Sequence, residues 1–270
     1  MIIVGDSRVE LSKLKDVQTI VTSPPYWDLR DYGSKAQVGF GQSLEAYIDD
    51  LVNILDSSKN CLNPQGSMWV NLGDKYDKGN LLGLPYLIAF ALKSKGWIMR
   101  QAIIWAKPNP MPESTKNRCS RSYEHFFHFT RQMDYYYDNE SIKEPAKWFG
   151  KDRRSGQGRF AYKTKFDGKK ANGQQAFVVV NEMRNKRDVW TIATKPFKGA
   201  HYAVMPEALI EPAILSTSKE GDLIVDPFAG SGTVGLVAGR LKRPFIGIEL
   251  NEDYAELAKS RINTNKTCLK

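Results

Sequence analysis

The stretch Asp226-Pro-Phe-Ala-Gly230-Ser-Gly232-Thr233 decides the fold that this sequence predicts. It follows the apolar run Leu223–Asp226, which is typical of a buried strand, and opens the segment Thr233–Leu241, which is typical of a helix. Glycines at such a junction let the backbone approach a ligand closely, and the first N–H groups of the helix are free to bind an anionic group. The stretch therefore predicts a ligand site at the carboxyl end of a strand in an α/β sheet.

An acidic residue extends this site along the chain. Glu249 ends the next predicted strand, Phe245–Glu249, where it is placed to accept hydrogen bonds from both ribose hydroxyls of a nucleoside cofactor. The segment Gly230–Gly235 also satisfies the dinucleotide fingerprint, so an NAD-dependent oxidoreductase is an open alternative. Asp226 would repel a pyrophosphate but attract the ammonium group of a methionine moiety, which favours S-adenosylmethionine (SAM).

A second motif, Thr22-Ser-Pro-Pro-Tyr-Trp27, follows the β-branched run Val17–Val21. Two prolines end a strand, because proline has no N–H to donate and restricts the residue before it. The turn thus holds the Ser23 hydroxyl, free carbonyl oxygens and the Tyr26 ring at a strand's carboxyl end. Rigid acceptors beside a stacking ring suit a planar base with an exocyclic amino group. The alternative is a turn whose tyrosine only caps the core, and Trp27 is equally consistent with a pocket wall or with the core.

Charge is concentrated in one part of the chain. Of the 270 residues, 139–200 hold 15 Lys and Arg against 6 Asp and Glu, which accounts for the whole net charge of +9. This asymmetry indicates a polyanionic partner, with a solvated lysine-rich insertion as the alternative. The three cysteines form no CxxC pair, and no run of eighteen apolar residues is present. We expect neither a metal nor a disulfide, no signal peptide or membrane span, and a cytoplasmic protein.

Short apolar strands alternate with amphipathic helices outside the basic segment, which predicts an α/β fold with a mostly parallel, twisted sheet and helices on both faces. We expect three regions: 1–138, the basic insertion 139–200, and 201–270. The expected strands are Met1–Val4, Thr19–Thr22, Gly66–Asn71, Arg100–Trp105, Glu124–Thr130 paired with Tyr135–Tyr137, Leu223–Asp226 and Phe245–Glu249. The expected helices are Ser43–Ser57, Gly83–Lys95, Pro206–Ser216, Thr233–Leu241 and Asp253–Asn263.

Taken together, the motifs resemble those of the amino-group DNA methyltransferases of the permuted β class. In that family the catalytic motif comes first, a target-recognition region lies in the middle and the glycine-rich cofactor motif comes last. The resemblance covers almost the whole chain outside 139–200 and implies a Rossmann-like, SAM-dependent methyltransferase fold. It implies catalytic roles for Ser23, Pro24, Pro25 and Tyr26. It implies SAM binding by Asp6, Asp226, Phe228, Gly230, Gly232, Thr233 and Glu249, and by the segment from His201 to Pro206.

The implied reaction is direct in-line transfer of a methyl group to the amino nitrogen of a base flipped out of duplex DNA. In the family the motif usually begins with Ser in enzymes that methylate cytosine N4 and with Asp in those that methylate adenine N6. Ser23 therefore favours cytosine N4, and adenine N6 is the same-family alternative. Methylation of cytosine carbon 5 is rejected because it needs a nucleophilic cysteine, typically after a proline, and none of the cysteines follows a proline.

DNA contacts are expected from the basic region and from one loop. Arg153, Arg154 and Arg159 are chosen by charge density alone. Asn109 and Arg121 lie in the part of the chain that resembles the region beside the target base; a proline-rich surface loop at Lys107–Glu113 is the open alternative. Asp74 has two open interpretations, a pocket residue or a helix cap. The expected partner is double-stranded DNA in a prokaryotic cytoplasm, nucleoid-associated when bound; a cognate restriction endonuclease, and a monomer or homodimer, are left open.

Overall fold

The computed structural model describes residues 1–28, 36–146, 182–194 and 204–268, and the side chains up to residue 264. The chain divides into two compact units, one made of residues 1–141 with 187–270 and the other of residues 142–186. In the smaller unit the described strands β8 (Glu144–Pro145) and β9 (Met183–Arg184) pair antiparallel, and Arg184 forms an ion pair with Glu144 at 2.7 Å. The predicted division at residues 138 and 200 stays a proposal.

The larger unit is built on one eight-stranded, mostly parallel sheet, as predicted. Every neighbouring pair of strands is parallel except the two pairs that contain β7, which runs antiparallel to β3 and to β6. In spatial order the strands are β1 (Ile2–Val4), β12 (Phe245–Glu249), β11 (Leu223–Asp226), β2 (Val17–Thr22), β3 (Leu62–Leu72), β7 (Tyr123–Thr130), β6 (Ile98–Ala106) and β10 (Val189–Thr191).

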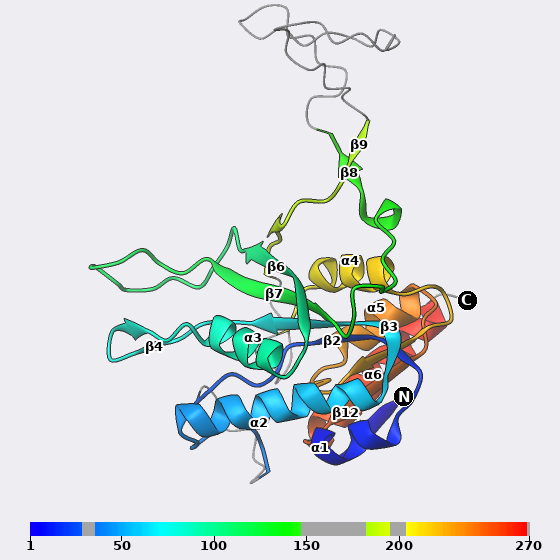
Figure 1. Cartoon of the computed structure of the whole chain (residues 1–270), viewed down its shortest axis with the longest axis horizontal. Coiled ribbons are helices and arrows are strands. Elements are labelled where there is room, and N and C mark those ends of the chain that lie inside the picture. The colour runs from blue at the N-terminus through cyan, green and yellow to red at the C-terminus, as the bar shows by residue number, and fades with distance from the viewer. Residues whose placement is uncertain (29–35, 147–181, 195–203, 269–270) are drawn as a thin grey trace, which may run out of the picture. The chain divides into compact units, whose positions relative to one another are not determined.

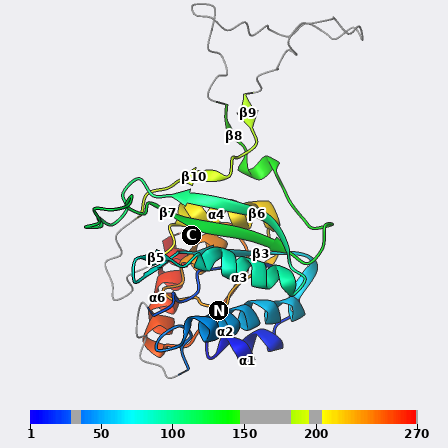
Figure 2. The ribbon, with the colours of Figure 1, turned by 60° about the vertical axis from the view of Figure 1, so that its left-hand side comes forward.

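Helices cover both faces of this sheet because alternate strand residues point to opposite sides. Ile20 and Met68 pack with α2 (Leu44–Ser57) and α3 (Leu84–Ser94). Their neighbours Val21 and Trp69 pack with the other group of helices. That group consists of α4 (Glu207–Thr217), α5 (Thr233–Arg240) and α6 (Glu252–Cys268). Figures 1 and 2 show α2 and α3 on one side of the strands and α4 on the other.

The helices begin where the sequence supplies a suitable start. The Ser43 hydroxyl accepts a hydrogen bond from the backbone N–H of Ala46 at 3.2 Å and so caps α2. Gly83 and Gly232 precede α3 and α5 in the left-handed conformation, which favours glycine. The remaining short elements are α1 (Ser7–Glu10), η1 (Leu11–Lys13), η2 (Ser58–Asn60), β4 (Tyr76–Asp77), β5 (Asn80–Leu81) and η3 (Glu140–Ile142).

One predicted strand is wrong. Tyr135–Tyr137 is not a strand, because both edges of β7 are already occupied by β3 and β6. The backbone N–H of Tyr136 instead donates to the Gln65 carbonyl at 3.1 Å, and the rings on either side of it pack on His128. The three-residue strand β10 was missed, since it is too short to show a period. None of the helices in the described ranges is long and apolar enough to span a membrane.

This topology places several loops at one edge of the sheet. The parallel strands β1, β2, β3, β11 and β12 all end there, and the antiparallel strand β7 begins there. Ligands in open α/β sheets bind outside the carboxyl ends of the strands. The motifs that follow β2 and β11 are therefore brought together at this edge.

Candidate active site

A cavity at this edge is shared by the two sequence motifs. The turn after β2 contributes Ser23 to Tyr26, and the loop after β11 contributes Asp226 to Ser231. The remaining lining residues are Asp6, Ser7, Ala36, Gln37, Val38, Ile54, Val204, Met205, Thr233, Val234, Ile248, Glu249, Leu250, Asn251 and Tyr254. Residues that lie about 200 positions apart in the sequence thus face one space.

The glycine loop holds the Glu249 carboxylate in place. Gly230 has φ +50° and donates its N–H to Oε2 of Glu249 at 2.7 Å. The N–H of Asn251 donates to Oε1 at 2.9 Å, and burial raises the pKa of this carboxyl. Each carboxylate oxygen keeps acceptor capacity for one further donor, as binding of a ribose diol requires.

Asp226 joins the two motifs. Its carboxylate is 2% exposed and accepts hydrogen bonds from the Thr22 hydroxyl at 2.6 Å and the Phe228 N–H at 3.0 Å. Burial raises its pKa to about 7, against the opposing effect of these two donors. Because Thr22 ends β2 and Asp226 ends β11, this contact sets the proline turn, residues 23–26, beside the glycine loop.

The lining residues fit SAM. Asp226 and Glu249 offer carboxylates to an ammonium group and to ribose hydroxyls, while Phe228, Ile248 and Leu250 give apolar walls for a purine. Asp6 is also in the lining; its side chain accepts hydrogen bonds from Arg8, which hold its pKa below its usual value. When bound, SAM supplies an electrophilic methyl group on a positively charged sulfur.

The proline turn is held by a hydrogen bond on one side and leaves acceptors on the other. The Tyr47 hydroxyl donates to the Pro25 carbonyl at 2.9 Å. Among the described residues the Pro24 carbonyl has no hydrogen-bond partner, and both Pro24 and Ser23 line the cavity. Trp27 packs partly against the core and donates to the Gln42 carbonyl at 3.0 Å.

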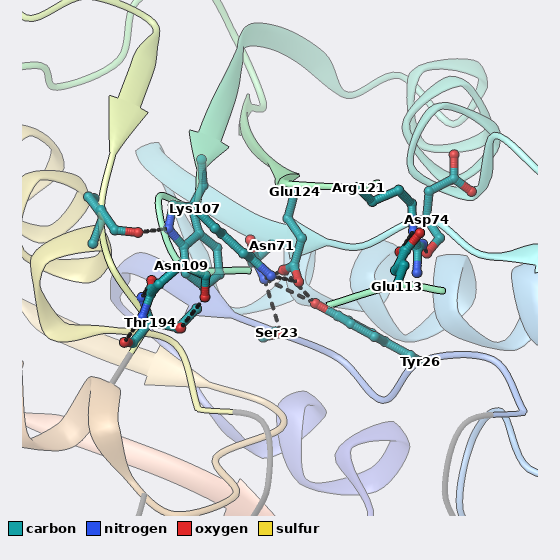
Figure 3. A network of polar contacts seen from close by, with 12 residues as sticks. Ser23, Tyr26, Asn71, Asp74, Lys107, Asn109, Glu113, Arg121, Glu124 and Thr194 are labelled. Atoms are coloured by element: carbon teal, nitrogen blue, oxygen red, sulfur yellow. Dashed lines mark hydrogen bonds and ion pairs between the residues drawn. The ribbon is translucent and has the colours of Figure 1, made fainter. Parts of the chain in front are cut away.

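A glutamate that the sequence reasoning missed lies behind this turn (Figure 3). Oε2 of Glu124 accepts hydrogen bonds from the Tyr26 hydroxyl at 2.7 Å and from the Asn71 amide at 2.6 Å. The Lys107 ammonium pairs with Oε1. Burial, and then the nearby Glu124 charge, raise the pKa of the Tyr26 phenol well above its ordinary value. Glu124 and Lys107 are largely buried, at 14% and 18% exposed.

A local signal for Glu124 was present in the sequence. It is the only acidic residue in Tyr123–Thr130, which is otherwise aromatic, histidine or threonine. Because β7 is antiparallel, its first residues lie where the parallel strands end. Glu124 pairs with Trp105 across the ladder to β6, which brings Lys107 close by.

Other residues predicted for the site do not line the cavity. Pro206 is the N-cap of α4 and Gly232 the N-cap of α5, and neither lines the cavity. Asp74 accepts hydrogen bonds from the N–H groups of Leu84 and Lys75, so it has the capping role that was the alternative to a pocket role.

The two predicted DNA contacts from the loop already have protein partners. Asn109 exchanges hydrogen bonds with the backbone of Thr194 at 2.9 and 3.0 Å. Arg121 bonds to the Asp74 carbonyl and to Glu113. Their DNA contacts stay predictions, and the predicted residues Arg153, Arg154, Arg159 and His201 lie outside the described residues.

The family model for N6/N4 methyltransferases, described as DNA methylase, matches residues 17–260. The chain belongs to this DNA methylase family. The methylase is 38% identical to the type II methyltransferase M.Cfr9I of Citrobacter freundii, over 97% of this chain and 87% of the relative. It is also 38% identical to M.SmaI of Serratia marcescens, over 97% and 90% of the two chains.

Solved structures share the fold of this methylase. PvuII DNA methyltransferase (cytosine-N4-specific) matches with a TM-score of 0.71 and 19% identity, over 98% of this chain and 90% of that one. A putative DNA modification methylase of Thermus thermophilus, solved in complex with SAM, matches with a TM-score of 0.65 and 23% identity, over 98% and 93%. Family membership sets aside the oxidoreductase alternative.

Proposed function

We propose that this DNA methylase transfers a methyl group from SAM to the exocyclic N4 amino group of cytosine at a specific site in duplex DNA. The observation that carries the proposal is the position of Ser23 and Pro24 in the wall of a cavity that the glycine loop also lines. Acceptors for an amino group and residues suited to SAM then face the same space.

Ser23 and Pro24 prepare the amino nitrogen for reaction. The lone pair of an exocyclic amino group is delocalised into the ring of the base, which makes the nitrogen a poor nucleophile. Hydrogen bonds from its two N–H groups to Ser23 Oγ and to the Pro24 carbonyl would draw it towards tetrahedral geometry and localise the lone pair. Most of the catalysis is then positioning and electrostatic stabilisation by groups that are already in place. The Tyr26 ring stacks on the flipped base.

Cytosine rather than adenine is proposed because the motif begins with Ser23. The fold neighbour PvuII methyltransferase is itself cytosine-N4-specific. Methylation of carbon 5 is disfavoured by the cysteines of the described chain: Cys61 is buried, which raises its pKa to about 11, and neither it nor Cys119 lines the cavity. A partner endonuclease is proposed from the type II relatives, and the cytoplasmic location stays a prediction.

Nucleoside analysis tests the proposal. The full chain is incubated with methyl-labelled SAM and duplex DNA of high sequence complexity, and the DNA is digested to nucleosides and separated by mass spectrometry. We expect label in N4-methylcytosine, and none with Ser23→Ala. Label in N6-methyladenine would overturn the cytosine assignment. Sequencing of the same DNA would locate the recognition site and test the role of Arg153, Arg154 and Arg159 by comparison with their alanine variants.

A further inference from the structure

Methyl transfer to a neutral amino group creates a proton that must leave. The nitrogen–methyl bond forms as the methyl–sulfur bond breaks and sulfur keeps the electron pair, so the nitrogen holds one proton too many. A hydroxyl is not basic enough to keep a proton, whereas an aspartate at the first motif position would be. A motif that begins with Ser23 therefore needs a proton acceptor elsewhere.

The side chains around Ser23 lead to one carboxylate (Figure 3). The Ser23 hydroxyl is hydrogen-bonded to the Tyr26 phenol. The Tyr26 hydroxyl in turn donates to Glu124 at 2.7 Å. Both side chains are held from the side by Asn71, whose amide nitrogen lies 3.5 Å from Ser23 Oγ and 3.2 Å from the Tyr26 hydroxyl.

We propose that Glu124 is the final acceptor of the proton released from the amino group, through Ser23 and Tyr26. The inference rests on the proposed function only in requiring an amino group as methyl acceptor, and it applies to cytosine N4 and adenine N6 alike. Glu124 touches neither base nor SAM in this assignment. It acts through Tyr26 and is a positioning residue that also stores the proton.

The relay balances atoms and charge. The amino proton passes to Ser23 Oγ as the serine's own proton passes to the Tyr26 oxygen, and the tyrosine's proton passes to Oε2 of Glu124. Ser23 and Tyr26 end as they began. The positive charge lost from the sulfur is matched by the negative charge lost from the carboxylate, so the net charge of the site does not change; the Lys107 ammonium keeps its charge.

The residues around Tyr26 and Glu124 support the roles of these two side chains in the relay. Burial keeps Tyr26 protonated at neutral pH, so it can donate to Glu124. Lys107 pairs with the other carboxylate oxygen and so holds Glu124 in place against Tyr26. Asn71 offers only an amide and cannot serve as a base. The carboxylate of Asp226 is bonded to Thr22 and Phe228 and stands outside this chain of contacts.

A double-mutant cycle tests the relay. Glu124→Gln keeps the shape and an acceptor oxygen for Tyr26 but is not a base, and Tyr26→Phe keeps the ring but breaks the chain. Methyl transfer is measured in a single turnover with enzyme saturated by SAM and DNA. We expect each variant to be slower by about 100-fold, in the range of general acid–base effects. The double variant should be no slower than either single one, because both changes break the same chain.

The matched control is Glu220→Gln, which alters an exposed glutamate paired with Lys242. It should transfer methyl groups at the wild-type rate. Calorimetry should give SAM affinities within about twofold of the wild type for all variants, since the changes lie outside the cofactor walls. Circular dichroism spectra that match the wild type would confirm that the variants fold.

Two further measurements separate proton acceptance from simple orientation. Glu124→Asp keeps a carboxylate and should recover part of the rate that Glu124→Gln loses, because only a carboxylate can take up the proton. The charged or titratable groups near Glu124 are Tyr26, Lys107 and His125, which are unchanged in both variants. A measurement that does not depend on activity is NMR of protein whose tyrosines are labelled at Cζ. It should report a lower pKa of Tyr26 in Glu124→Gln than in the wild type, because the Glu124 charge is gone. The Tyr26 signal is identified by its absence from Tyr26→Phe.

Glu124→Gln with the wild-type rate would overturn the relay while leaving the proposed function untouched. A double variant whose loss equals the product of the two single losses would also overturn it, because independent roles multiply. If the wild type itself transfers no label to DNA, the proposed function fails, and the relay fails with it.

Discussion

Replacing Asp226 with asparagine should remove a large part of the pH dependence of this protein's stability. Asp226 is 2% exposed, and its pKa rises from 3.8 to about 7 on folding without ligand. Between these values the unfolded chain carries an ionised aspartate and the folded chain a protonated one, so folding takes up a proton. The contribution of Asp226 to the free energy of unfolding is fully present below about pH 4 and is lost as the pH rises through about 7.

The size of the effect follows from the two pKa values. Each unit of pKa difference corresponds to about 1.4 kcal/mol, so between about pH 5 and about pH 8 the wild type should lose about 2.5 kcal/mol relative to Asp226→Asn. The asparagine oxygen can still accept hydrogen bonds from Thr22 and Phe228, which keeps the fold. Any cost of its new N–H groups is independent of pH and shifts the whole curve without changing its slope.

Urea unfolding of the ligand-free proteins at several pH values measures this difference. The control is Asp49→Asn, at an exposed position on α2; its curve of unfolding free energy against pH should run parallel to that of the wild type. If the curve of Asp226→Asn is also parallel to that of the wild type, the buried, protonated aspartate is refuted. SAM affinity gives a second measure: in the wild type it should rise over the same pH window, because a cation favours the ionised Asp226, and the rise should be absent in the asparagine variant.

Three further substitutions probe the cavity. Ser23→Ala should slow methyl transfer by about 100-fold or more while calorimetry finds unchanged SAM affinity; near-normal turnover would contradict the assigned role. Glu249→Ala should weaken SAM binding by about tenfold to a hundredfold, since hydrogen bonds to a charged group are lost, and an unchanged dissociation constant would speak against this site. In Gly73→Ala the new Cβ would lie 3.0 Å from Cε2 of Tyr26, so the ring must shift. We expect methyl transfer to be about tenfold slower at constant SAM affinity. An unaltered rate would mean that the position of the ring is not critical.

Much of the fold was predictable because its signals are local. The β-branched and apolar strands, the glycines before α5 and the Ser43 cap each act within a few residues, and the mostly parallel sheet followed from their order. The prediction of a strand at Tyr135–Tyr137 was wrong for a reason no local pattern contains. Whether an aromatic segment becomes a strand depends on a free sheet edge, and β7 offers none.

The sequence by itself determined the two motifs and the roles proposed for their residues. The proline turn and the glycine loop are stiff local structures, so these roles could be proposed before any fold was known. Only the tertiary structure joined them, through the buried hydrogen bond from Thr22 to Asp226 across 204 positions. It also brought Glu124 to Tyr26 across 98 positions, because an antiparallel strand begins where the parallel strands end. Such contacts depend on strand order and register, which are decided by the packing of the whole sheet.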